Sequence, residues 1–312
     1  MSKIKELYEN VTNRIIAELE QGVRPWAKPW NAEHAAGRIT RPLRHNGVGY
    51  NGINVLMLWW SAQDRGFISP YWLTFRQAKE LGAFVRKGEK GSPVVYANTI
   101  SKTEQNDAGE DVEVNVPFMK AYTVFNADQI DGLPEHYTQL AKPVIDPVQR
   151  IDRVEAFFRN TNADIRTGGG QAYYAVGGDY IQMPPFEAFK SAESYYATLG
   201  HETTHWTRHP SRLDRSFGRE KWGDAGYARE ELVAEIGAAF LCADLDIEPA
   251  IREDHAPYIA NWLKVLENDH RAIFTAAAHA QRAADFLHGL QDPAGQAEQQ
   301  EDSDDDEDRA AA

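Results

Sequence analysis

The sequence predicts an α+β protein in which an N-terminal α/β domain precedes a mainly helical domain with a small antiparallel sheet. Three observations predict this. Apolar residues recur at spacings of three and four near both ends of the chain, which is typical of helices. Short stretches rich in β-branched and aromatic residues, typical of strands, lie in both halves. Three prolines within 133–149 interrupt the periodicity. We therefore expect domains at 1–134 and 150–291, a linker at 135–149 and a disordered acidic tail at 292–312.

In the first half, the spacing predicts an amphipathic helix over 4–19, ended by Gly22 and Pro25. A second helix is expected over 73–81, with Thr74 as its cap. Residues 94–96 and 117–125 read as strands, and the polar stretch 101–113 between them reads as a hairpin loop.

In the second half, a helix is expected over 151–160, followed by strands at 172–176 and 179–183. Gly177 and Gly178 join these strands, which is a good hairpin signal. Three helices are then expected, over 194–208, 228–245 and 257–287.

The composition argues against several classes of protein. No stretch approaches the roughly 20 apolar residues that a membrane span needs, and no apolar segment near the N-terminus resembles a secretion signal. Cys242 is the only cysteine, so neither a disulfide within the chain nor a cysteine-based zinc site is possible. We expect a cytoplasmic protein with no membrane partner.

The charge is unevenly distributed. The formal net charge is −14, which by itself argues against nucleic acid. Residues 21–100, however, hold 11 Lys and Arg against 4 Asp and Glu, whereas 292–312 hold 9 Asp and Glu against one Arg. The first half is therefore basic. The tail could mimic DNA and occupy that basic region between encounters, although a merely solubilising tail is the simpler interpretation.

The strongest motif is His201-Glu202-Thr203-Thr204-His205. On a helix, residues four apart share a face, so the two imidazoles can bind one metal ion. The glutamate next to the first histidine can then act as general base on a water activated by that ion. We predict zinc as the metal, with another divalent metal possible.

The helix predicted over 228–245 offers a third ligand. Glu231 follows His205 by 26 residues, and Glu235 lies one turn further on the same face. We expect Glu231 to bind the metal and Glu235 to hydrogen-bond a ligand histidine. Glu230 and Glu235 remain alternative ligands. A third histidine at the metzincin position is absent, because Ser211 occupies it.

A peptide or protein substrate would fit such a site. The strand 179–183 could pair with an extended peptide by β-augmentation. A nearby tyrosine could polarise the scissile carbonyl, although each candidate is more simply a core aromatic. The candidates are Tyr173, Tyr174, Tyr195 and Tyr196.

The basic half combines cationic and aromatic side chains, as a groove for single-stranded DNA requires. Phosphates would meet the charges, and bases would stack on the rings. Tryptophans are usually core residues, so the composition alone is weak evidence. The candidates for phosphate contacts are Arg44, Arg86, Lys87 and Lys90, and those for stacking are Tyr50, Trp72 and Phe75.

Three stretches resemble the N-terminal domain shared by plasmid antirestriction proteins of the ArdC type and by some conjugative-plasmid primases. They are 45–54 (HNGVGYNGIN), 72–78 (WLTFRQA) and 85–91 (VRKGEKG). The second half resembles the zincin-like domain of the antirestriction proteins, and not the primases. Its matching stretches are 201–207, 211–213 and 227–235. Arg208 departs from the glycine expected there.

The resemblance implies that the N-terminal domain binds single-stranded DNA and that the protein protects incoming plasmid DNA from host restriction during conjugation. It leaves two alternatives open. The chain could be a metallopeptidase that cleaves a host protein, with the N-terminal domain as targeting module, or its metal site could be structural. The position of Glu202 argues against a structural site, which has no use for a base beside a ligand. The sequence does not determine the oligomeric state.

Overall fold

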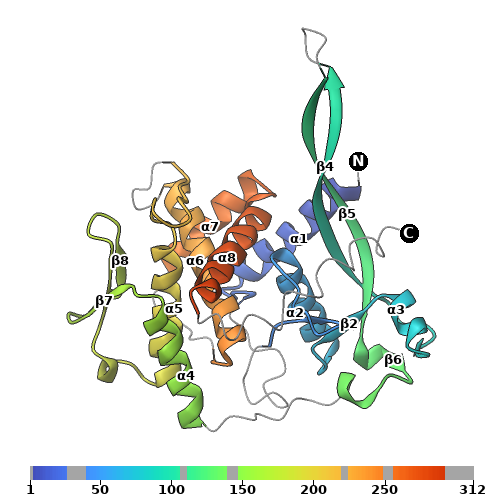
Figure 1. Cartoon of the computed structure of the whole chain (residues 1–312), viewed down its shortest axis with the longest axis horizontal. Helices are drawn as coiled ribbons and strands as arrows, with labels where there is room; N and C mark the ends of the chain where they lie inside the picture. Colours follow the sequence, from blue (N-terminus) through green and yellow to red (C-terminus); the bar gives the residue numbers. More distant parts are fainter. Residues whose placement is uncertain are drawn as a thin grey trace.

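The computed structural model describes residues 3–26, 40–105, 111–138, 147–218, 224–248 and 256–291. Figure 1 shows α6, α7 and α8 in the middle, β7 and β8 at the left beside α5, α3 with β2 and β6 at the right, and a two-stranded ribbon that rises from the body. The architecture is α+β, as expected. The tail expected at 292–312 and most of the expected linker, 139–146, lie outside the described residues.

The described residues of the first half form three helices and two small sheets. The helices are α1 (Lys3–Glu20), α2 (Ile53–Arg65) and α3 (Phe75–Glu80). The larger sheet has the order β1 (Leu43–Arg44), β2 (Tyr71–Leu73), β5 (Asp111–Asn126) and β4 (Ser92–Gln105), and β3 (Phe84–Val85) pairs with β6 (Ile130–Asp131). Short 3-10 turns follow at Ala127–Gln129 and Glu135–Tyr137.

Local sequence explains two helix boundaries. Thr74 caps α3 in a capping box, because its side chain accepts from the Gln77 amide while the Gln77 side chain accepts from the Thr74 amide. Gly22, expected to end the first helix, adopts a φ of +73° just beyond α1, where a side chain would be strained. Both predictions are confirmed.

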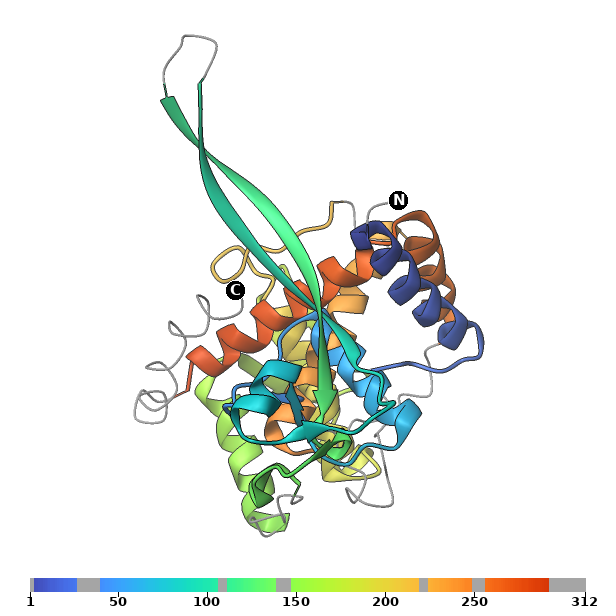
Figure 2. The ribbon, with the colours of Figure 1, turned by 90° about the vertical axis from the view of Figure 1, so that its right-hand side faces the viewer.

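The prediction of a hairpin loop over 101–113 is wrong in its bounds. β4 and β5 pair continuously from Ser92 opposite Val124 to Gln105 opposite Asp111, so most of the polar stretch is strand (Figures 1 and 2). Residues 101–105 (SKTEQ) are all polar, so this part of β4 shows no apolar alternation, and its described side chains, Ser101 and Thr103, are exposed. The pattern on which the prediction rested is therefore missing from a real strand.

The second half contains five helices and one sheet among its described residues. The helices are α4 (Pro147–Asn160), α5 (Ala192–Trp206), α6 (Ala225–Leu245), α7 (Ala256–Asn268) and α8 (Ala272–Gly289), with a 3-10 turn at Phe186–Ala188. The single helix expected over 257–287 is two helices. The Asp269 side chain accepts from the Arg271 amide at the break between them.

The expected hairpin is confirmed as β8 (Tyr173–Ala175) and β9 (Tyr180–Met183), but a third strand was missed. β7 (Asp164–Thr167) pairs with β9 in parallel, so the order is β7-β9-β8 and the sheet is mixed rather than antiparallel. β7 is mostly exposed, which removes the alternation that would have revealed it.

α6 lies at the centre of the helical half, packed against α5, α7 and α8. Its described side chains are buried around almost the whole circumference, and α6 ends at Asp246 with a φ of +58°. A helix that is apolar all round is an interior helix. The side chains of α6 are therefore held in a closely packed environment.

The two halves share one hydrophobic core. α1 packs along α7 (Figure 2), and the rings of Trp26 and Trp262 meet edge to face at 5.7 Å. Arg41 binds Asp244 of α6 through two hydrogen bonds of 2.8 and 2.7 Å. The division into domains at 1–134 and 150–291 stays a prediction about the sequence, because packing is continuous across it.

No helix among the described residues is long and apolar enough to cross a membrane.

The α5–α6 contact depends on a glycine. A Cβ on Gly237 would lie 2.6 Å from Cγ2 and 2.8 Å from Oγ1 of Thr204 on α5. Thr204 is fully buried, and its hydroxyl donates to the Gly200 carbonyl at 2.8 Å, so it has little room to give. The absence of a side chain at Gly237 lets the two helices approach closely.

We expect Gly237→Ala to destabilise the protein by roughly 1–3 kcal/mol, the usual cost of overpacking a core. The matched control is Gly200→Ala on the facing helix, whose added Cβ would meet Leu241 and Phe158 at an ordinary 3.7 Å. Thermal unfolding of both variants is the measurement. Equal melting temperatures for the two variants would show that the close approach does not need Gly237.

Candidate metal centre

Helix α5 presents the motif. It begins after Ser191, whose side chain accepts from the Ser194 amide at 3.1 Å. From Tyr196 to Trp206 every residue is buried, because the helix lies between α6 and the β8–β9 hairpin. His201 and His205 therefore project from one face of a rigid, buried helix.

The structure brings the three expected ligands together. The Nε2 atoms of His201 and His205 lie 3.2 Å apart. Glu231 on α6 places one carboxylate oxygen 3.6 Å from His201 Nε2 and the other 3.4 Å from His205 Nε2. One ligand atom from each residue falls within 4.8 Å of the others.

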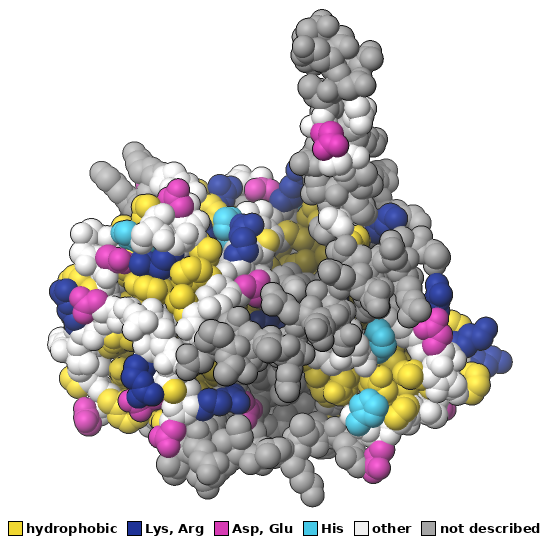
Figure 3. All heavy atoms as spheres, viewed as in Figure 1, with side chains coloured by type: hydrophobic (Ala, Val, Ile, Leu, Met, Phe, Trp, Pro, Cys, Tyr) yellow, Lys and Arg dark blue, Asp and Glu magenta, His cyan; other side chains and the backbone are white. Residues whose placement is uncertain are grey.

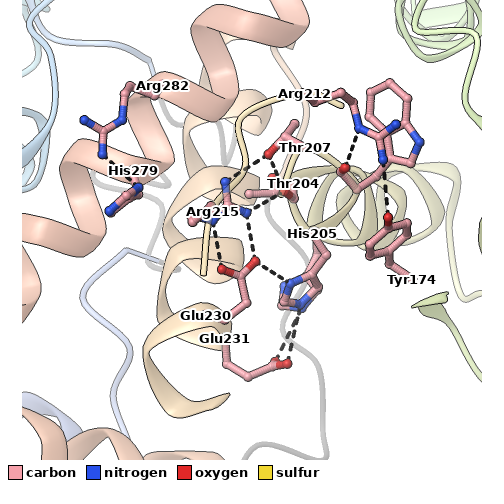
Figure 4. Close-up of polar contacts among 12 residues, drawn as sticks. Tyr174, Thr204, His205, Thr207, Arg212, Arg215, Glu230, Glu231, His279 and Arg282 are labelled. Carbon is pink, nitrogen blue, oxygen red and sulfur yellow. Dashed lines mark hydrogen bonds and ion pairs between the residues drawn. The ribbon is translucent and has the colours of Figure 1, made fainter. Parts of the chain in front are cut away.

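Glu230 is not a ligand in this arrangement. It contacts His205 through Nδ1, the ring nitrogen opposite Nε2. Its Oε1 lies 3.0 Å from His205 Nδ1, on the side of the ring away from Glu231 (Figure 4). Arg215 in turn binds Glu230 through two hydrogen bonds of 2.8 Å. Arg215 also donates to the Thr207 hydroxyl and the Thr204 carbonyl at the end of α5.

Glu235 takes the corresponding place behind His201, where its Oε1 lies 3.6 Å from Nδ1. Each of the two histidines thus has a carboxylate facing Nδ1, which orients the ring and leaves Nε2 for an ion. The contact of Glu235 is longer than a hydrogen bond, so the hydrogen bond expected of Glu235 stays a prediction. The same role for Glu230 was missed, because only tertiary structure shows which helix face meets His205.

The electrostatics of the cluster follow from these pairs. Burial raises the pKa of Glu230, but hydrogen bonds from Arg215 and His205 outweigh it and lower the pKa to about 2. Burial likewise opposes ionisation of Glu231, yet the charges of His205 and His201 hold its pKa well below the usual value. Burial disfavours the charged form of His205, but Glu231 and Glu230 raise its pKa to about 10. Without an ion, this histidine carries the positive charge that balances the carboxylates.

The donor set fits a divalent cation. Two imidazole nitrogens and one carboxylate are a ligand set found in catalytic zinc sites, where a fourth position stays open. Binding would displace the proton on His205, so metal affinity must fall as the pH falls.

Glu202, the expected base, is 3% exposed and lies in the same turn as His201. Tyr227 is a further residue at the site that the sequence did not reveal. Burial, the charge of Glu231 and hydrogen bonds with Tyr258 and Glu231 raise its pKa. Its position four residues before Glu231 on a helix is the only signal that could have found it.

The prediction that the strand 179–183 pairs with a peptide is wrong. β9 lies between β7 and β8 with both edges paired, so no further strand can add to it. The edge strands of this sheet are β7 and β8, and β8 packs beside α5. Of the expected tyrosines, Tyr174 donates its hydroxyl to Asp179 at 2.8 Å, and Tyr196 is buried against Phe158.

Two of the expected stacking residues are core residues. Tyr50 is 4% exposed and Trp72 is 1% exposed, so neither offers a ring to a base. The sequence could not distinguish these rings from surface ones, because aromatics at a groove and in a core look alike. Phe75, in contrast, is 61% exposed, and Phe84, which was not singled out, is 70% exposed.

The residues expected to contact phosphates differ in exposure and in the ion pairs that they form. Arg86 is exposed but forms ion pairs with Asp131 and Glu89, and it also donates to the Asp128 carbonyl. Lys87 and Lys90 are exposed on the segment after β3. Arg44 is half-buried, with its guanidinium 5.6 Å from the Tyr50 ring centroid. The lysines are thus the more accessible charges.

The fold and the metal centre define a zincin-like metallopeptidase domain behind a second, basic domain. Residues 152–279 match the family model of zincin-like metallopeptidases, and residues 5–125 match that of the N-terminal domain of the anti-restriction factor ArdC.

Solved structures and curated relatives agree with this. The metal-free crystal structure of the antirestriction protein ArdC from plasmid R388 is 51% identical, with 91% of this chain and 97% of that one covered at a TM-score of 0.75. Its Mn(II)-bound structure is 49% identical over the same shares, at a TM-score of 0.72. The uncharacterized protein y4eC of Sinorhizobium fredii is 42% identical over 93% of this chain and 94% of its own length. The chain belongs to the ArdC antirestriction family.

One expectation about the relatives is wrong. The DNA primase TraC of Escherichia coli is 38% identical over 92% of this chain, which is 27% of the primase. The second half is therefore shared with primases as well as with antirestriction proteins.

We expect Glu231→Gln to weaken binding of Zn²⁺ or Mn²⁺ strongly, because an amide is a neutral and poorer ligand than a carboxylate. Loss of a ligand should exceed the roughly 10- to 100-fold effect of losing a residue that supports one. Competition with a chromophoric chelator measures the affinity, and Glu193→Gln in the first turn of α5 is a control. Unchanged affinity in Glu231→Gln would show that another residue completes the site.

Proposed function

We propose that this protein binds single-stranded DNA through its N-terminal half and protects incoming plasmid DNA from host restriction during conjugation. It would do so in the cytoplasm, and it also carries a zinc-dependent peptidase-type site. The observation that carries the proposal is the joining, in one chain, of an intact His201, His205 and Glu231 ligand set to an N-terminal half with exposed aromatic and basic side chains.

The chemistry of the site is that of peptide hydrolysis. A divalent ion held by the three ligands would lower the pKa of a water molecule and polarise a peptide carbonyl. Glu202 would accept the proton of the attacking water and pass it to the leaving amine. The edge strand β8 offers backbone groups that would hold an extended peptide.

The DNA surface that we propose is formed by α3, β3 and the segment that follows. Phe75 begins α3 and Phe84 lies in β3, against which α3 packs. Lys87 and Lys90 add charge beside these rings, and Figure 3 shows Lys and Arg side chains next to hydrophobic ones over α3, at the right-hand edge. Exposed rings among cations suit a single strand, whose bases are unpaired and free to stack.

We expect the double variant Phe75→Ala/Phe84→Ala to bind a single-stranded oligonucleotide more weakly, at roughly 1–3 kcal/mol for each lost stacking contact. Fluorescence anisotropy at several salt concentrations measures this. Phe186→Ala is the matched control, since Phe186 is a comparably exposed ring (45%) in the other half of the chain. Equal loss in the control, or affinity insensitive to salt, would contradict the proposed surface.

A second candidate function is cleavage of a host protein, with the N-terminal half selecting the target. The presence of Glu202 beside a ligand favours it, because a base has no use in a structural metal site. The two candidates differ in which half of the chain protection requires.

We expect Glu202→Gln to lose peptidase activity while it still protects unmodified plasmid DNA transferred into a restricting host. The Phe75→Ala/Phe84→Ala variant should show the reverse, because DNA binding carries the protection. Transfer efficiency into restricting and non-restricting recipients measures the effect, and metal content confirms that the site is intact. Loss of protection in Glu202→Gln alone would favour proteolysis of a host protein.

A further inference from the structure

The metal centre includes residues from the other half of the chain. Arg24 and Trp26 follow α1, yet both reach Glu235 on α6. Arg24 Nη1 donates to Glu235 Oε2 at 2.8 Å, and Trp26 Nε1 donates to the same oxygen at 3.3 Å. The other carboxylate oxygen of Glu235 is the one that faces His201 Nδ1.

These contacts are buried. The side chains of Arg24 and Glu235 are 7% and 6% exposed, and Trp26 is 1% exposed against Trp262 of α7. A buried carboxylate is costly unless a cation and hydrogen bonds stabilise it. Arg24 and Trp26 therefore stabilise the buried carboxylate of Glu235 and fix which of its oxygens turns toward His201.

Each of the two histidines has a glutamate facing Nδ1 and an arginine that binds this glutamate, although the glutamate is closer at His205 (3.0 Å) than at His201 (3.6 Å). At His205, Glu230 faces Nδ1 and Arg215 binds Glu230, and both residues come from the second half of the chain. At His201, Glu235 faces Nδ1 and Arg24 binds Glu235, so here the cation comes from the first half. A carboxylate on Nδ1 orients a ligand imidazole and raises its basicity, so losing that support weakens metal binding.

We propose that Arg24, assisted by Trp26, is a positioning residue for the metal ligand His201, so that metal affinity in the second half depends on the first half. Arg24 acts only through Glu235. The inference rests on the proposed ligand set of His201, His205 and Glu231.

The test compares two arginine variants of the full chain. Arg24→Gln removes the cation behind Glu235. Arg41→Gln is the matched control, since Arg41 also comes from the first half and binds α6, at Asp244, nine residues beyond Glu235. Both ion pairs are largely buried, with Arg41 and Asp244 13% and 14% exposed. Arg41 also donates to Gln281 of α8 at 2.9 Å, so the control variant loses at least as much contact between the halves as Arg24→Gln. Only the contact of Arg24 leads to the metal.

We expect Arg24→Gln to bind Zn²⁺ and Mn²⁺ roughly 10- to 100-fold more weakly than wild type, as measured by chelator competition. Arg41→Gln should lose thermal stability yet keep the wild-type metal affinity. Added metal should also raise the melting temperature of Arg24→Gln less than that of wild type, because ligand stabilisation follows affinity. The absorption spectrum of the Co²⁺-loaded protein should change in Arg24→Gln alone.

Trp26→Phe provides a milder variant if Arg24→Gln does not fold. It keeps an aromatic ring against Trp262 and removes only the indole N–H, so we expect a smaller loss of affinity in the same direction. Wild-type affinity in Arg24→Gln, or in Trp26→Phe if only that variant folds, would overturn the inference. Equal losses in Arg24→Gln and Arg41→Gln would also overturn it, because docking of the halves would then explain both. If wild type itself bound no metal, the ligand set would be wrong, a failure distinct from these.

Discussion

The structure depends on the close contact between α5 and α6. The motif on α5 supplies only two ligands, and the third comes from α6, so the metal centre exists only if the helices approach within a side chain's reach. Gly237 permits that approach because a Cβ there would overlap Thr204. Burial of α6 on nearly all sides then fixes its rotation, and with it the positions of Glu230, Glu231 and Glu235.

Three carboxylates within two turns of one interior helix would be unstable without partners. Each has at least one arginine or histidine partner: Arg215 and His205 for Glu230, both histidines for Glu231, and Arg24 for Glu235. Glu231 and Glu230 raise the pKa of His205 to about 10, so before any ion binds a proton on this histidine supplies positive charge in the place of the metal. A divalent ion exchanges with that proton rather than entering a site of unpaired acids.

The same network joins the halves of the chain. Sequence composition separates a basic first half from a helical second half, and two family models match them separately. In the structure, however, α1 packs on α7, and Arg24, Trp26 and Arg41 reach α6. The metal centre is therefore joined to the first half of the chain through one shared hydrophobic core.

The sequence by itself predicted most of the helices, the β8–β9 hairpin, and His201, His205 and Glu231 as candidate ligands, because helical spacing and glycine turns are local properties. It failed where the pattern was absent or ambiguous. Residues 101–105 of β4 are polar throughout and β7 is mostly exposed, so neither shows apolar alternation, and Tyr50 and Trp72 looked like surface rings but lie in the core. Only the tertiary structure decided which side of each imidazole meets which glutamate, and that Arg24 and Arg215 stand behind them. Those contacts join residues up to 211 positions apart, and nothing in local sequence encodes the rotation of one packed helix against another.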